Sequence, residues 1–84
     1  MVIFYYSKFR QQFKKLPEEI KLLAEKKEEI FRKNPFDPKL KTHKLHGELS
    51  EFWAFSINYQ YRIIFDFINE DKIRFYSIGA HDIY

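Results

Sequence analysis

A proline-containing break divides this sequence into two halves with different hydrophobic periods. The break is Asn34-Pro35-Phe36-Asp37-Pro38, and proline both lacks a backbone donor and keeps the preceding residue out of the helical region. Before the break, apolar residues recur every three or four positions, as in an amphipathic helix. After it, they form short runs rich in aromatic and β-branched residues, which are typical of strands. The sequence therefore predicts a helical first half and a sheet built mainly from the second.

Two helices are predicted before the break. In the first, residues 7–16, the side chains of Phe9, Phe13 and Leu16 share one face, and we expect the Ser7 hydroxyl to cap the first turn. Pro17 ends this helix and is tolerated at the start of the next, which continues to the break. A short apolar run, residues 2–6, precedes both helices and is predicted to be a strand.

Three further strands are predicted after the break. They span residues 51–57, 60–68 and 72–78, and the turns between them are Asn58-Tyr59 and Asn69-Glu70-Asp71. The order is β-α-α-β-β-β in a single domain, residues 1–84. We expect an α+β fold in which two N-terminal helices pack on one face of a twisted antiparallel sheet, with the other face at least partly open.

Composition excludes several classes of protein. The chain has 84 residues, of which 17 are aromatic, too many for intrinsic disorder. It has no cysteine, and hence no disulfide framework or thiolate metal site. No apolar run approaches the roughly 20 residues of a membrane span, and the N-terminus lacks the features of a signal peptide. We expect a cytoplasmic protein without a cofactor and without a membrane partner.

Charge is unevenly distributed along the chain. Residues 1–50 hold 12 Lys and Arg against 7 Asp and Glu, whereas residues 51–84 hold 3 against 5. A basic half favours an anionic partner, either nucleic acid or an acidic peptide. Charge alone favours the simpler interpretation, a pair of solvated, lysine-rich helices.

Arg62 is the first candidate for chemistry. It interrupts the most apolar predicted strand, and the alternation of side chains places it opposite Tyr61 and Ile63. If the helices cover the Ile63 face, Arg62 lies on the open face, where its guanidinium could bind a phosphate through two hydrogen bonds. An ion pair with Asp66 or Glu51 is an equally good interpretation.

The three histidines and the last residue are further candidates. His43 and His46 are three residues apart, and His81 and Tyr84 lie near the C-terminus. Histidine titrates near neutrality and is a common general acid or base, but no third residue has the spacing of a metal ligand. Tyr84 could stack on a base or pack the terminus onto the sheet. For each histidine alone, an exposed surface residue is the favoured alternative.

A set of motifs resembles a known family. They are Lys44-Leu45-His46-Gly47, Trp53, Tyr61-Arg62-Ile63-Ile64-Phe65 and Ile78-Gly79-Ala80-His81-Asp82-Ile83-Tyr84. Together they resemble the RelE/ParE toxin superfamily of type II toxin–antitoxin systems, in particular its RelE/StbE and YafQ-like members. The resemblance implies the same fold and a metal-independent endoribonuclease, or mRNA interferase. Such an enzyme cleaves mRNA on the ribosome by attack of the 2′-hydroxyl on the adjacent phosphate and so inhibits translation.

The resemblance also implies roles for individual residues. Arg62 would contact the phosphate, and His81 would transfer a proton or contact the phosphate. Tyr84 would stack on or orient the substrate. The implied catalytic set is Arg62, His81, Tyr84, His43 and His46. We further expect Lys44, Phe55 and Arg74 to bind the substrate. Phe55 would offer a stacking face beside Arg62 if Asn58-Tyr59 is a two-residue turn, although ordinary packing is the favoured alternative. The strand before Arg62 is uncharged, whereas RelE has lysines there. A histidine and an aspartate of YafQ-like sites are replaced at positions aligned with Ser56 and Gln60.

Partners and alternatives follow from the same resemblance. We expect a hetero-oligomer with a small cognate antitoxin whose binding segment is acidic, and we expect mRNA and the ribosome as targets. ParE-like relatives share the fold but inhibit DNA gyrase without acting as nucleases. A toxin that has decayed into an antitoxin-binding module is a third possibility.

Overall fold

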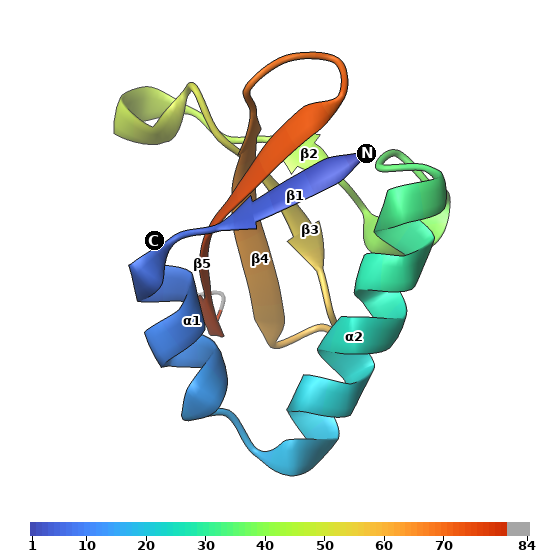
Figure 1. Cartoon of the computed structure of the whole chain (residues 1–84), viewed down its shortest axis with the longest axis vertical. Coiled ribbons are helices and arrows are strands. Elements are labelled where there is room, and N and C mark those ends of the chain that lie inside the picture. Colours follow the sequence, from blue (N-terminus) through green and yellow to red (C-terminus); the bar gives the residue numbers. More distant parts are fainter. Residues whose placement is uncertain (81–84) are drawn as a thin grey trace.

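In a computed structural model that describes residues 1–80, two helices lie on one side of a five-stranded sheet (Figure 1). The elements are β1 (Val2–Tyr5), α1 (Ser7–Lys14), α2 (Glu18–Lys33), the 3₁₀ turn η1 (Pro38–Leu40), β2 (His43–Lys44), the 3₁₀ turn η2 (Gly47–Leu49), β3 (Trp53–Ser56), β4 (Tyr61–Phe67) and β5 (Lys72–Ala80). The α+β class and the position of the helices are as predicted. In residues 1–80 neither helix has the length and apolar character that a membrane span requires.

The sheet is mixed, which corrects the prediction of a wholly antiparallel one. Its order is β1-β5-β4-β3-β2, and β1 pairs with β5 in parallel while the other pairs are antiparallel. The meander strands are joined by tight turns and must run antiparallel, but β1 and β5 are linked by most of the chain. The two-residue strand β2 was not predicted, because two residues are too few to show an alternating pattern.

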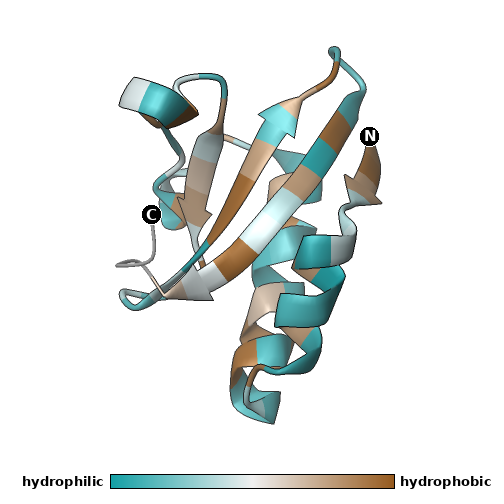
Figure 2. Cartoon of the chain, turned by 90° about the vertical axis from the view of Figure 1, so that its left-hand side faces the viewer, coloured by the Kyte–Doolittle hydropathy of each residue, from teal (hydrophilic) through white to brown (hydrophobic). Residues whose placement is uncertain are grey.

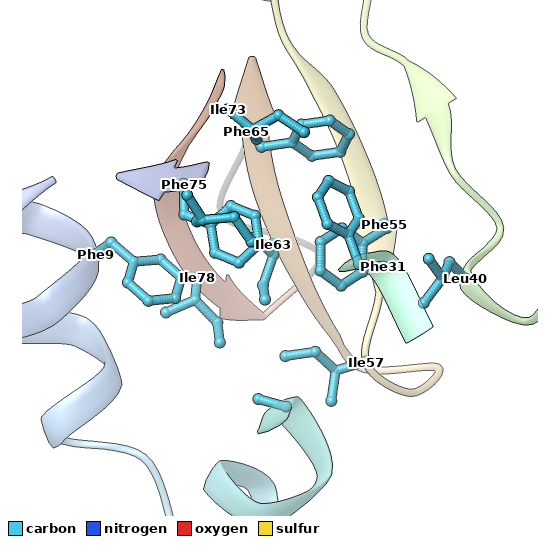
Figure 3. Packing of buried hydrophobic residues seen from close by; sticks show 12 residues of the cluster. Phe9, Phe31, Leu40, Phe55, Ile57, Ile63, Phe65, Ile73, Phe75 and Ile78 are labelled. Carbon is cyan, nitrogen blue, oxygen red and sulfur yellow. The ribbon is translucent and has the colours of Figure 1, made fainter. Parts of the chain in front are cut away.

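A phenylalanine cluster forms the core between the helices and the sheet (Figure 3). Phe31 of α2 is fully buried, and its ring centre lies 4.8 Å from that of Phe55, 4.9 Å from that of Phe65 and 5.4 Å from that of Phe75. Ile63 belongs to the same core. The helices therefore cover the Ile63 face of β4, and Arg62 lies on the opposite face.

The segment from Leu45 to Phe52 covers one end of that opposite face. Figure 2 shows the sheet between the two helices on one side and this segment on the other. Leu45, Leu49 and Phe52 pack there in a smaller apolar cluster with three residues of the sheet, namely Ala54, Ile64 and Tyr76. The other end of the face, with Ser56 and Arg62, lies outside this cluster.

A β-bulge in β5 affects the packing of side chains on both faces of the sheet. The register shifts by one between Ile64, which pairs with Ser77, and Phe65, which pairs with Phe75. Tyr76 is the extra residue, and its ring packs on Phe52 at a centroid distance of 4.9 Å. Because the bulge interrupts the alternation, both Phe75 and Ile78 can point into the helix-side core.

Helix α1 protects the edge of β5 beyond the end of β1. The Gln12 side-chain oxygen accepts a hydrogen bond from the Ile78 backbone N–H at 2.9 Å. Strand β5 continues to Ala80, two residues further than predicted. The predicted cap at Ser7 is wrong, because Tyr6 occupies the N-cap position and no side chain caps the helix.

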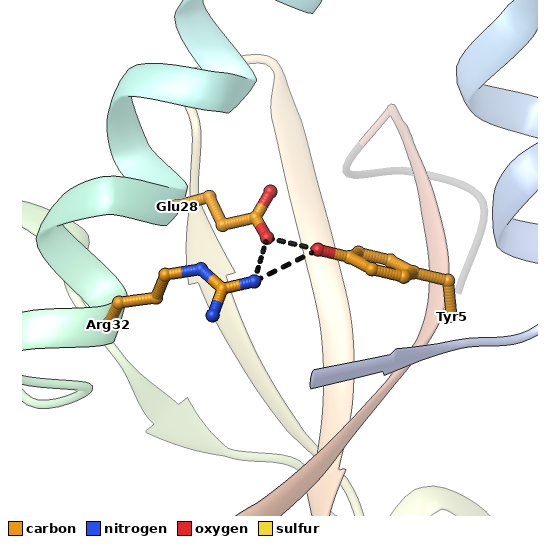
Figure 4. A network of polar contacts seen from close by, with 3 residues as sticks. All are labelled: Tyr5, Glu28 and Arg32. Atoms are coloured by element: carbon orange, nitrogen blue, oxygen red, sulfur yellow. Dashed lines mark hydrogen bonds and ion pairs between the residues drawn. The ribbon is translucent and has the colours of Figure 1, made fainter. Parts of the chain in front are cut away.

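A polar network fastens β1 to α2 (Figure 4). The Tyr5 hydroxyl donates to the Glu28 carboxylate, and Arg32 donates to Glu28 at 3.2 Å and to the Tyr5 hydroxyl at 3.3 Å. Burial, and then the hydrogen bond to Glu28, raise the pKa of Tyr5 above its ordinary value. The network holds the N-terminal strand and the long helix in one arrangement.

Candidate active site

Arg62 on β4 is held by a hydrogen bond that it donates to a residue of the neighbouring strand β3. It pairs with Ser56 across β3 and β4, and its Nη1 donates to the Ser56 Oγ at 2.8 Å. Ser56 is buried, and a hydrogen bond to a charged group contributes about 1.5–3 kcal/mol. The ion-pair interpretation fails for Asp66, because Arg74 binds that carboxylate. Among residues 1–80, Glu51 forms no ion pair either.

Arg62 lines a basic pocket of about 290 Å³. The pocket lies where the β3–β4 turn approaches α2 (Figure 1). The lining residues are Lys27, Lys39, Lys41, Ser56, Ile57, Asn58, Tyr59 and Arg62. Four of them are cationic and none is acidic, so within the described part of the chain the pocket concentrates positive potential. An anion is the ligand that such a pocket favours.

The chemistry of the guanidinium points to the same ligand. A phosphate has several acceptor oxygens and suits the planar, multiple donors of a guanidinium. The Nε of Arg62 is buried and has no hydrogen-bond partner within residues 1–80. The geometry thus supports phosphate recognition by Arg62.

The turn beside the pocket is rigid and carries an exposed ring. The Asn58 side-chain oxygen accepts hydrogen bonds from the backbone N–H groups of Gln60 and Tyr61, both at 2.8 Å. The connection is longer than the predicted Asn58-Tyr59 reversal, because β3 ends at Ser56 and β4 begins at Tyr61. Tyr59 is 91% exposed, so its ring is open to stacking.

His43 lies on the same face of the sheet as Arg62. It pairs with Ala54, two residues before Ser56 on β3, and side chains two apart on a strand share a face. Its Nδ1 is 3.0 Å from the backbone oxygen of Lys41. A carbonyl oxygen only accepts, so Nδ1 carries the hydrogen and Nε2 of the neutral ring has a free lone pair. The exposed His43 can therefore act as a base.

Lys44 and Arg74 do not join the pocket. Lys44 pairs with Trp53, which packs on the helix side, and its Nζ is 5.9 Å from the centre of the Trp53 ring. Arg74 binds Asp66 through two hydrogen bonds, at 3.1 and 2.5 Å, near the other end of β4. These hydrogen bonds are the main cause of its raised pKa. The structure therefore separates both side chains from Arg62.

Phe55 is fully buried, so its assignment as a substrate-binding residue is wrong and the alternative of ordinary packing is confirmed. It pairs with Ile63 and faces the helices, where its ring stacks on Phe31. His46 is exposed and precedes η2, on the segment that covers the far end of the face. His81 and Tyr84 lie outside the described residues.

No pattern in the sequence pointed to Lys27, Lys39 or Lys41, and Ser56 was noted only as a position where YafQ-like sites have another residue. The lysines come from α2, η1 and the residue after η1, and their convergence depends on the tertiary fold. The excess of basic residues in the first half was the available signal, but it did not identify individual residues. Among residues 1–80, no three His, Cys, Asp or Glu side chains converge as a metal site would require.

Comparison with known proteins gives no sequence match but several structural ones. The sequence matches no protein-family model and no curated protein. The structure is similar to that of YafQ from E. coli, with a TM-score of 0.79 at 17% identity over 94% of this chain and 91% of YafQ. A YoeB/ParE toxin from Agrobacterium tumefaciens gives 0.81 at 12% identity, over 96% of this chain and 99% of the toxin.

The third similar structure is a complex. It is the YoeB–YefM complex from Staphylococcus aureus, with a TM-score of 0.78 at 15% identity over 96% of this chain and 97% of the matched one. Identities this low establish the fold and nothing more specific. The chain has the fold of the YafQ and YoeB toxins, the one implied by its resemblance to the RelE/ParE superfamily.

Proposed function

We propose that this chain is the toxin of a type II toxin–antitoxin system and cleaves mRNA on the ribosome without a metal. The observation that carries the proposal is Arg62, which Ser56 holds in a pocket of four cations. His43 lies on the same face with Nε2 free to accept a proton. The fold shared with the YafQ and YoeB toxins supports the same assignment.

The reaction requires a base, an acid and a stabilising charge. In the proposed step, His43 takes the proton of the 2′-hydroxyl, the 2′-oxygen bonds to phosphorus, and the bond from phosphorus to the 5′-oxygen breaks. An acid protonates the leaving 5′-oxygen, and we assign this role to His81, for which the resemblance implies proton transfer or contact with the phosphate. Arg62 stabilises the charge that develops on the phosphate oxygens. The products are a 2′,3′-cyclic phosphate and a 5′-hydroxyl.

The ribosome would supply what this small site lacks. Within residues 1–80, the charged and aromatic side chains around Arg62 are three lysines and one exposed tyrosine, which leaves most of the orientation of two nucleotides for in-line attack to another source. Correct positioning can account for a large part of a rate enhancement, and mRNA held on the ribosome would arrive already positioned. The proposed site of action is therefore cytoplasmic.

An antitoxin is the proposed protein partner. The similar YoeB was solved as a complex with YefM, and we propose a corresponding partner here with an acidic binding segment. Such a segment would neutralise the four cations of the pocket, Arg62 included, and fold on binding. Coexpression with the adjacent gene should restore growth. Arrest that persists with each neighbouring gene present would contradict this part of the proposal.

Induction of the chain in cells tests the function. We expect translation to stop and primer extension to show new 5′ ends within mRNA, and we expect neither with Arg62→Ala. A DNA-damage response with intact mRNA would indicate a ParE-like gyrase inhibitor instead. Absence of both effects in a protein that still binds its antitoxin would indicate a decayed toxin.

A further inference from the structure

Three lysines around Arg62 come from separate elements that the fold brings together. Lys27 is on α2, Lys39 is in η1, and Lys41 follows η1. Like charges in one small pocket repel each other, and within the described residues no carboxylate lines it. In the proposed reaction Arg62 binds one phosphate, so the three lysines are available to bind a second anionic group.

Lys41 occupies a position where glycine is usual. Its φ is +54°, in the left-handed region, and it is the C-cap of η1. A side chain is disfavoured there, whereas glycine adopts this conformation without a steric penalty. The chain nevertheless has a lysine, and this residue lines the pocket.

Tyr59 adds an aromatic surface at the same pocket. It is 91% exposed and lines the pocket, and Asn58 orders the turn on which it lies. A ring this exposed contributes almost nothing to the core. Proteins that bind single-stranded nucleic acid combine a basic groove with aromatic rings on which bases stack. Tyr59 and the lysines reproduce that combination within one pocket.

We propose that Lys27, Lys39, Lys41 and Tyr59 form a subsite for one unpaired nucleotide of RNA next to the phosphate held by Arg62. The lysines contact the backbone phosphate of this nucleotide, and its base stacks on Tyr59. An RNA duplex does not fit this arrangement, because its bases are already stacked and paired. The inference rests on the proposed function only in taking RNA as the ligand.

Binding of a short RNA to the free protein tests the subsite. The probe is a fluorescent six-nucleotide oligoadenylate with 2′-O-methyl riboses, which the proposed reaction cannot cleave. Tyr59→Ala should lower the affinity about 10-fold or more, and Tyr59→Phe should retain it. Lys41→Gly should lower the affinity and reduce the salt slope by about 0.7, the value for one phosphate contact on a single strand.

Controls separate this subsite from general charge effects. Lys41→Gly should fold at least as stably as the wild type, because glycine suits the left-handed conformation. Lys26 neighbours Lys27 on α2 but does not line the pocket. Lys27→Ala should therefore weaken binding more than Lys26→Ala. Equal losses in these two variants, or no measurable binding by the wild type at low salt, would overturn the subsite.

The two proposals can fail separately. Cleavage of mRNA on the ribosome together with unchanged RNA affinity in Tyr59→Ala and Lys41→Gly would overturn the subsite alone. Specific loss of affinity in those variants, without any cleavage by the wild type, would support the subsite and contradict the nuclease.

Discussion

The hydrogen bond from Arg62 Nη1 to Ser56 Oγ, 2.8 Å long, fixes the guanidinium at the inner side of the basic pocket. The two residues form the last pair of the register between β3 and β4, next to the turn that joins these strands. The sheet therefore holds the charged group before any substrate binds. A preorganised charge of this kind stabilises a transition state without the cost of rearranging at the moment of reaction.

Ser56→Ala should lower the cleavage rate, but less than loss of Arg62 itself. The substitution leaves the guanidinium in place without its acceptor, and we expect a loss of about 10-fold together with about 1–3 kcal/mol of stability. Ser77→Ala is the matched control, because Ser77 is also buried but bonds no arginine among the described residues. Equal rates for the two variants would show that the Ser56 contact does not position Arg62.

His43→Gln should reduce cleavage by about 100- to 10,000-fold, the usual contribution of a general base. Circular dichroism should show that the variant is folded. His46→Gln is the comparison, since His46 lies on the segment over the other end of the face. An unchanged cleavage rate in folded His43→Gln would remove His43 from proton transfer.

The end of strand β5 determines how many C-terminal residues can be deleted without disrupting the sheet. Ala80 pairs with Tyr61, and Gly79 pairs with Arg62, so a chain ending at Ala80 keeps the sheet intact. We expect this truncation to fold, as judged by circular dichroism, and to lose cleavage because it lacks His81 and Tyr84. His81→Gln in the full chain should be nontoxic and still bind the antitoxin. Full cleavage by either protein would assign the acid to another group.

Tyr5 makes stability depend on pH in the alkaline range. Burial and the hydrogen bond to Glu28 raise its pKa, so above about pH 10 the unfolded chain loses this proton before the folded protein does. The unfolded state then binds fewer protons, and the free energy of unfolding falls as pH rises. Urea unfolding between pH 8 and 11 should show a smaller fall for Tyr5→Phe. Parallel profiles for the two proteins would contradict this assignment.

The sequence predicted which side chains share a face of the sheet better than it predicted how the edge strands pair. Alternation along β4 correctly placed Ile63 and Phe65 on one face and Arg62 on the other, and the structure shows that the helices cover the Ile63 face. Alternation fails where the register changes, as at the bulge before Tyr76. It also carries no information on how the first strand pairs with the last. The parallel β1–β5 pair therefore could not be predicted from local patterns.

The candidate site likewise contains residues that the sequence identified and residues that it did not. Arg62 was identifiable because a charged residue within an otherwise apolar strand is unusual and calls for a structural or functional explanation. Phe55 was misassigned because the register across the β3–β4 turn decides its face, and the turn is longer than expected. Lys27 and Lys41 are distant in sequence, and only the packing of α2 and η1 against the turn unites them. When residues converge only through the tertiary structure, their spacing in the sequence does not reveal it.

The most direct test of the central claim is the single-turnover cleavage rate of mRNA on purified ribosomes by wild type and Arg62→Ala. We expect a product with a 2′,3′-cyclic phosphate and a rate about 100- to 1,000-fold lower for the variant, with circular dichroism showing that the variant is folded. Cleavage at the wild-type rate by folded Arg62→Ala would contradict it.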